Sequence, residues 1–146
     1  MSPSVTRAYV GTSGWSYPSW KPAFYPAELK PTEVLGHYAR ALPTVELNTT
    51  GYRLPAEGQF ERWAEQTPEV FRFAPKLVAY RTSQVATFEE RVRRLGDRLG
   101  PIRVLVGAKR DEGFLTLLLG SLDPSLRLAF DFRHESWEGV ELPPNA

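Results

Sequence analysis

The chain has 146 residues, of which 42% are hydrophobic, 24% charged and 12% aromatic, and its formal net charge is +1. These values are typical of one globular domain, and the balanced charge gives no global electrostatic drive toward nucleic acid or an anionic membrane. The lack of cysteine excludes disulfides, thiolate metal sites and a cysteine nucleophile. The first residues lack the apolar core of a signal peptide and no run is long enough to span a membrane, so we expect a cytoplasmic protein without membrane contact.

The first predicted strand covers residues 8–13, and a segment rich in tryptophan, tyrosine and proline follows it up to Pro26. Such a connection is rigid rather than flexible. One interpretation is a plug that closes one end of the fold, which we favour because aromatic side chains pack more often than they bind. The alternative is a wall beside a ligand, on which a base or a sugar ring stacks.

The most informative stretch is TVELNTTGYRLP, at residues 44–55. Because side chains alternate along a strand, Glu46 and Asn48 point to one side and the apolar residues between them to the other. Ligands of parallel α/β folds lie at the carboxyl ends of strands. We therefore predict Glu46, Asn48 and Arg53 as site residues, with a structural ion pair as the alternative for the carboxylate.

Three further strands are predicted, at residues 71–77, 102–106 and 126–133. Lys76 is expected at the carboxyl end of the first of these, and Arg81 in the following loop offers a second cation. In the last strand Asp131 and Arg133 lie opposite the phenylalanines, and His134 follows at once.

Helices are predicted where apolar residues recur at intervals of three and four, at residues 32–42, 56–66, 88–99 and 111–120. His37 lies off the apolar stripe of the first helix and is expected at the surface. Gly107 and the basic residues after it precede the last helix, whose first N–H groups can meet an anion. We keep a phosphate site there as an alternative only.

Each interval between strands has room for one helix, which favours an α/β fold with about five parallel strands and right-handed connections. Polar groups then gather on one face of the sheet, where an unpaired buried charge costs several kcal/mol. Their surplus of cations favours an anionic ligand.

A catalytic arrangement can be drawn from the same residues. Glu46 or Asp131 is the base and His134 the acid or orienting group. Developing negative charge is stabilised by three cations, Lys76, Arg133 and Arg53.

The same carboxylates and His134 also form a conceivable divalent-metal set. Two carboxylates and one histidine, spread along a chain and surrounded by cations, are common by chance. We therefore predict no metal and no cofactor.

Four motifs, VGTSGWSYPSW with PAFYP, VELNTTGYRLP, FRFAPKL and AFDFRHESW, occur in this order. Together they resemble domain-of-unknown-function family 72, the YecE-like proteins, over nearly the whole chain. The resemblance implies a single YecE-like domain over residues 1–146, the N-terminal part of a TIM-barrel-like fold without an established reaction. The recurrent polar positions of the family fall on Ser13, Trp15, Glu46, Asn48, Tyr52, Lys76, Arg133, His134 and Trp137.

Four features depart from the family pattern. Gly51 stands in place of an aromatic residue, Asp131 in place of glutamate, and Val-Gly-Ala-Lys in place of Gln-Leu-Pro-Pro. The later strands of the family are absent, and about five strands cannot close an eight-stranded barrel. We expect an incomplete barrel whose open edge can self-associate. Three interpretations are open: the chain is a shortened family member with its own closure, a fragment, or a chain that borrows strands from a partner.

The predicted function is binding of a small anionic or phosphorylated ligand at the strand ends, with hydrolysis as an extension. Nucleic acid is an alternative partner. The opposing interpretation is a non-catalytic binding or structural remnant, in which the charges satisfy one another. A metal-dependent phosphodiesterase acting on nucleic acid rests chiefly on fold analogy. Whether the chain is an enzyme stays open at this point.

Overall fold

A computed structural model describes residues 7–79 and 82–146. Five parallel strands form one open sheet in sequential order, and their parallel pairing agrees with the room for one helix in each interval between strands. This confirms the α/β prediction with about five parallel strands. The strands are β1 (Gly11–Ser13), β2 (Thr44–Leu47), β3 (Arg72–Val78), β4 (Ile102–Val106) and β5 (Leu128–Phe132). The second cation predicted at Arg81 lies outside the described residues.

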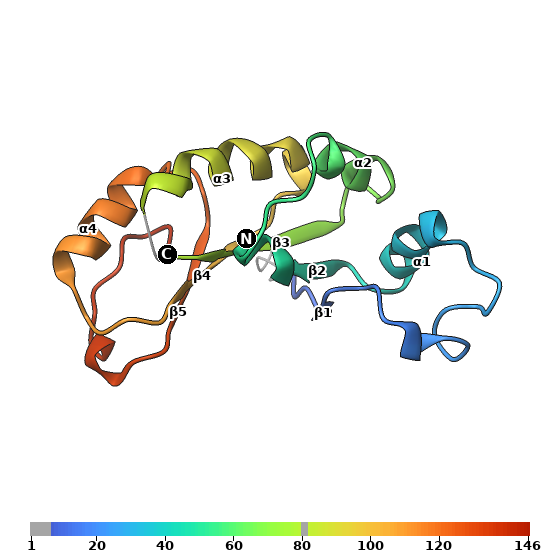
Figure 1. The fold of residues 1–146 in the computed structure, drawn as a ribbon, viewed down its shortest axis with the longest axis horizontal. Coiled ribbons are helices and arrows are strands. Elements are labelled where there is room, and N and C mark those ends of the chain that lie inside the picture. The colour runs from blue at the N-terminus through green and yellow to red at the C-terminus, as the bar shows by residue number, and fades with distance from the viewer. Residues whose placement is uncertain (1–6, 80–81) are drawn as a thin grey trace, which may run out of the picture.

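The helices are α1 (Val34–Ala41), α2 (Gln59–Glu65), α3 (Val85–Val92) and α4 (Glu112–Ser121). Helices α2, α3 and α4 follow one another along one side of the sheet, and α1 lies at the end formed by β1 and β2 (Figure 1). In the described part of the chain, no helix is long and apolar enough to cross a membrane.

The helix predicted at residues 88–99 is wrong in its bounds. Helix α3 begins earlier, and a 3-10 segment, Arg93–Arg98, replaces its second half. The reason is Gly96, which adopts φ 59° and ψ −133° inside the predicted range. Glycine reaches this region without a side-chain clash, so the chain turns there toward β4.

The two faces of the sheet differ in burial. The side chains of Val45, Phe73 and Val104 are 0% exposed and belong to the core under the helices. Residues that alternate with them, such as Glu46 and Arg103, are only half-buried. The opposite face, called the inner face from here on, therefore carries the polar side chains of the sheet.

The aromatic segment packs against α1. The Trp20 ring stacks on Tyr38 at 6.5 Å between ring centres, and Tyr25 is 1% exposed. Burial raises the pKa of Tyr25 to about 12. His37, predicted at the surface, is instead half-buried, and its Nε2 lies 3.0 Å from the carbonyl oxygen of Phe24. The packing interpretation is therefore confirmed for Trp20, Phe24 and Tyr25, which together are called the aromatic plug.

Candidate functional site

Arg103 of β4 is the centre of an ionic network on the inner face. Its Nη1 lies 2.8 Å from Glu46 Oε1 on β2, and its Nη2 lies 2.6 Å from Asp131 Oδ2 on β5. Arg133 Nη2 also contacts Asp131 Oδ2, at 2.9 Å. The side chains of Arg103, Glu46 and Asp131 are 32%, 25% and 26% exposed. These four residues, called the Arg103 network, link three of the five strands.

The contact between Arg103 and Glu46 crosses the strand that lies between them. Strand β3 separates β2 from β4, and neighbouring strands lie about 4.8 Å apart. The β3 residue in register with Glu46 is Ala74. Arg103 itself is in register with Lys76 of β3. Its guanidinium therefore reaches Glu46 diagonally across β3, past Ala74, whose methyl group leaves room for it.

Arg103 was not predicted as a site residue, although the sequence around it carries a usable signal. Within the strand motif IRVLV, arginine occupies a position that alternates with three buried apolar residues, Ile102, Val104 and Val106. Such a position points to the inner face together with Glu46 and Asp131. Arg72, by contrast, bonds the carbonyl oxygens of Glu69 and Phe71 near the amino end of β3 and stays outside the network.

The network changes the ionisation of its members. The hydrogen bond from Arg103 is the main cause that holds the pKa of Asp131 below its usual value, and the bond from Arg133 adds to it. The same contacts with Asp131 and Glu46 raise the pKa of Arg103. Asp131 therefore stays ionised at neutral pH, and its low pKa makes it a weak proton acceptor.

Lys76 forms a second polar cluster at the carboxyl end of β3. The residue is 6% exposed, and its Nζ donates to Asn48 Oδ1 at 3.0 Å and to the Tyr52 hydroxyl at 3.2 Å. The ammonium also lies 4.8 Å from the centre of the Tyr52 ring. These three residues are called the Lys76 cluster. Among residues 7–79 and 82–146, no carboxylate forms an ion pair with Lys76.

The turn after β2 holds the Lys76 cluster in place. Thr50 in the 3-10 segment Asn48–Gly51 donates its hydroxyl to the carbonyl oxygen of Lys76 and accepts from the Lys76 N–H. A Cβ added to Gly51 would lie 2.8 Å from Val78 Cγ2 and 3.1 Å from Lys76 Cγ. The missing side chain at position 51 thus lets this turn lie directly against Lys76.

A cavity of about 360 Å³ opens beside both groups of polar residues. It is lined among others by Trp15, Trp63, Glu46 and Asn48. The rings of Trp15 and Trp63 are perpendicular, with 5.1 Å between their centres. We call this space the tryptophan cavity. It brings together three predicted site residues, Trp15, Glu46 and Asn48, and adds Trp63 from α2, which was not predicted as a site residue.

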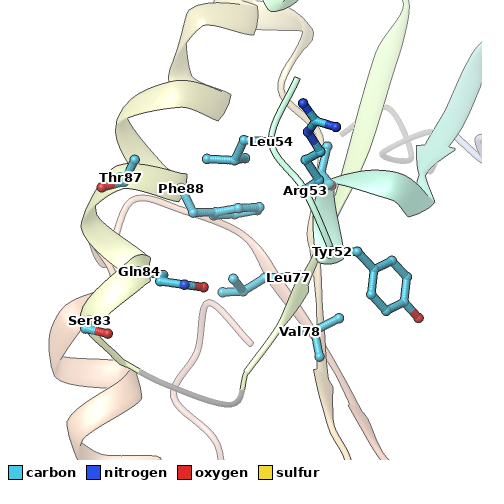
Figure 2. A pocket seen from close by; sticks show the side chains of 11 residues that line it. Tyr52, Arg53, Leu54, Leu77, Val78, Ser83, Gln84, Thr87 and Phe88 are labelled. Carbon is cyan, nitrogen blue, oxygen red and sulfur yellow. The ribbon is translucent and has the colours of Figure 1, made fainter. Parts of the chain in front are cut away.

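Arg53 does not line the tryptophan cavity, although a neighbouring cavity of about 610 Å³ brings it beside Tyr52 and Trp63. Arg53 also lines a different cavity, of about 320 Å³, together with Leu54, Leu77 and Phe88 on the helix side of β3. In Figure 2, these apolar side chains point toward one another between α3 and β3, whereas Tyr52 points away from them. Ser13 ends β1 in register with Glu46, and its carbonyl oxygen accepts from the Tyr17 hydroxyl.

His134 and Trp137 lie beyond the end of β5. His134 Nδ1 accepts from the Ser136 N–H at 3.1 Å and thereby caps the 3-10 segment Glu135–Trp137. Trp137 is 3% exposed, stacks on Phe132 and donates its Nε1–H to the carbonyl oxygen of Ala108 at 2.8 Å. Neither residue lines the tryptophan cavity.

Two alternatives from the sequence find little support in the geometry. In the described parts of the chain, no three His, Cys, Asp or Glu residues gather closely enough to hold a metal ion. The amino end of α4 is capped by its own carboxylate, because Asp111 Oδ1 accepts from the Phe114 N–H at 2.9 Å. Arg110 beside it pairs with Glu112. An anion would therefore compete with two carboxylates there.

Comparison with known proteins agrees with the resemblance of the four motifs. A family model described as "Protein of unknown function DUF72" matches residues 9–142. The chain belongs to this family. It is 36% identical to UPF0759 protein YecE of Escherichia coli (strain K12) over 101 residues, which are 68% of this chain and 35% of YecE. UPF0759 protein YunF of Bacillus subtilis (strain 168) is 31% identical over 68 residues, or 47% of this chain and 23% of YunF.

Solved structures of the family share the fold. A DUF72 family protein of Thermotoga maritima MSB8 superposes with a TM-score of 0.67 at 29% identity, covering 89% of this chain and 57% of that protein. A DUF72 family protein of Enterococcus faecalis V583 gives a TM-score of 0.69 at 21% identity, covering 88% and 52%. These neighbours agree with a TIM-barrel-like fold. The chain thus spans about a third of the curated relatives it matches and about half of the solved ones.

Proposed function

We propose that the carboxyl ends of β2 and β3 bind a small anionic, phosphorylated ligand, with Lys76 as the main cation. The observation that carries this proposal is the burial of Lys76 among neutral partners. A buried ammonium without a counter-charge costs several kcal/mol, and hydrogen bonds from an amide and a phenol offset only part of it. A bound anion supplies the missing negative charge.

The other charges of the inner face agree with this assignment. Arg103 divides its guanidinium between the two carboxylates, and Arg133 shares Asp131 with it. Three cations, with Lys76 included, thus face two carboxylates. The surplus positive charge attracts an anion to this face before any specific contact forms.

Access to Lys76 depends on Tyr52. Tyr52 is 70% exposed, and both its hydroxyl and its ring contact the Lys76 ammonium. Rotation of an exposed side chain is fast, and turning the Tyr52 ring aside would open the ammonium to the solvent side of the strand ends. A phosphate could then accept from Lys76 and from the Tyr52 hydroxyl together.

The proposed hydrolytic extension depends on Glu46 rather than on all three predicted catalytic residues. Glu46 lines the tryptophan cavity, whereas Asp131 and His134 do not. Arg103 holds Glu46 Oε1, which leaves its second oxygen to take a proton from a ligand hydroxyl or a water. Asp131 acts on this carboxylate only through Arg103. A metal-dependent phosphodiesterase is not favoured, because both candidate carboxylates are already ion-paired.

Anion-dependent melting tests the proposal. We expect inorganic phosphate, compared with chloride at equal ionic strength, to raise the melting temperature of the chain, since a ligand that binds only the folded state stabilises it. Lys76→Met should abolish the shift, and Lys109→Met, a matched change of an exposed lysine beside α4, should retain it. An equal shift in the Lys76 variant would refute the proposal, and a loss confined to the Lys109 variant would move the anion to α4.

A further inference from the structure

Trp15 differs from the aromatic plug that follows it in the sequence. Trp20, Phe24 and Tyr25 pack on α1, whereas Trp15 is half-buried and lines the tryptophan cavity. The hydroxyl of buried Tyr25 donates to the carbonyl oxygen of Trp15 and fixes its backbone. The plug therefore positions Trp15 without burying its ring. The packing and ligand-wall interpretations each apply to a different part of the segment.

The geometry of the cavity selects a class of occupant. Trp15 and Trp63 meet at 90° and form a corner, not a parallel slot that could hold a flat base between two rings. One indole face suits the C–H face of a sugar ring, which is apolar, and the volume of about 360 Å³ suits a small molecule. Glu46 and Asn48 on the polar side can accept from and donate to ring hydroxyls.

Asn48 connects this cavity to the proposed anion site. It lines the tryptophan cavity, and its Oδ1 accepts from Lys76 Nζ at 3.0 Å. A ring bound against Trp15 therefore extends its charged substituent toward Lys76. We infer that the ligand is a phosphorylated monosaccharide, with the ring on Trp15 and the phosphate on Lys76. This inference rests on the proposed function and adds the chemical identity of the uncharged part of the ligand, the sugar ring.

Arg103 has a positioning part in this arrangement. It fixes Glu46 Oε1 at 2.8 Å, so that the carboxylate keeps one orientation at the edge of the cavity. The free Oε2 then serves a sugar hydroxyl. Arg103 itself does not line the cavity and so acts through Glu46.

Calorimetric titration of the whole chain tests the inference with ribose 5-phosphate, glucose 6-phosphate, inorganic phosphate, glucose and adenosine monophosphate. We expect a sugar phosphate to bind at least about tenfold more tightly than inorganic phosphate, equal to about 1.4 kcal/mol. Trp15→Ala should remove this gain and leave phosphate binding unchanged. Tyr9→Ala, which removes an exposed aromatic ring outside the cavity, is the matched control and should retain the gain.

Failure of this inference can be told apart from failure of the proposed function. If phosphate binds through Lys76 but no sugar phosphate binds more tightly, or Trp15→Ala keeps the gain, the sugar is refuted and the anion site stands. If adenosine monophosphate gains affinity and ribose 5-phosphate does not, the occupant of the corner is a base. If nothing binds through Lys76, both fail. Should Trp15→Ala not fold by circular dichroism, Trp15→Phe must lower the gain without changing phosphate binding.

Discussion

The inner face carries two polar clusters, each built around a cation, that differ in how the charge of that cation is balanced. In the Arg103 network, every cation contacts a carboxylate at 2.6 to 2.9 Å. In the Lys76 cluster the cation is more deeply buried, yet its partners are an amide and a phenol. The cations of the first cluster are neutralised by carboxylates of the chain, whereas the cation of the second cluster is not.

This difference shows that a cation on the inner face does not by itself identify a binding site, because its partners decide whether its charge is neutralised. A completed ion pair is expected from a structural role, since a buried charge must be neutralised for the fold to be stable. A charge that the protein neutralises only partly is stabilised further by a ligand. Removal of the Arg103 charge must therefore lower the stability of the fold, whereas removal of the Lys76 charge must not.

The largest effect is expected for Arg103→Met. It leaves Glu46 and Asp131 on one face without their shared cation and should lower the free energy of unfolding by about 2 kcal/mol. Urea unfolding at pH 7 measures the change. The triple variant Arg103→Met, Glu46→Gln, Asp131→Asn removes both orphaned charges and should recover most of the loss. No recovery would mean that the arginine stabilises through its aliphatic stem.

Lys76→Met, in contrast to Arg103→Met, is not expected to destabilise the fold. It replaces a buried ammonium that has neutral partners with an apolar side chain of similar length, which should leave the stability unchanged or raise it by up to about 1 kcal/mol. The same urea titration without phosphate measures this change. A loss of stability as large as that of Arg103→Met would show that Lys76 stabilises the fold as much as Arg103 does, and would contradict the difference between the two clusters.

A smaller effect is expected from pH. In the folded chain, Arg103 and Arg133 lower the pKa of Asp131 below its ordinary value of 3.8. The pairing of Asp131 therefore stabilises the fold above the ordinary pKa. This contribution is lost only as the pH falls from about 4 through the lowered folded pKa. The difference in unfolding free energy between the wild type and Asp131→Asn should therefore be constant from pH 7 to 5, at about 1 kcal/mol, and shrink below pH 4. A difference that persists undiminished at pH 2 would contradict the pairing.

The sequence was sufficient for the five parallel strands, because each interval between strands has room for one helix. It was also sufficient for most of the polar inner face, because alternation fixes which side of a strand each residue occupies. Glu46, Lys76 and Asp131 were found in this way. Arg103 obeys the same rule but was missed, since its two partners lie 57 and 28 residues away in the chain. The contact of Trp15 with Trp63 could not be predicted, because it depends on how α2 packs beside β2. The early end of α3 depended on one glycine inside an otherwise regular apolar pattern.

The smallest effect is expected for Arg133→Met, which tests whether the Arg103 network needs its exposed member. The Arg133 side chain is 56% exposed, and solvent screens its pair with Asp131, so the expected loss of stability is about 0.5 kcal/mol or less. Its charge, however, still adds to the potential at the strand ends. The variant should therefore weaken phosphate binding to a small extent, and the effect should vanish at high salt, where surface charges are screened. A loss of stability equal to that of Arg103→Met would place Arg133 among the structural charges instead.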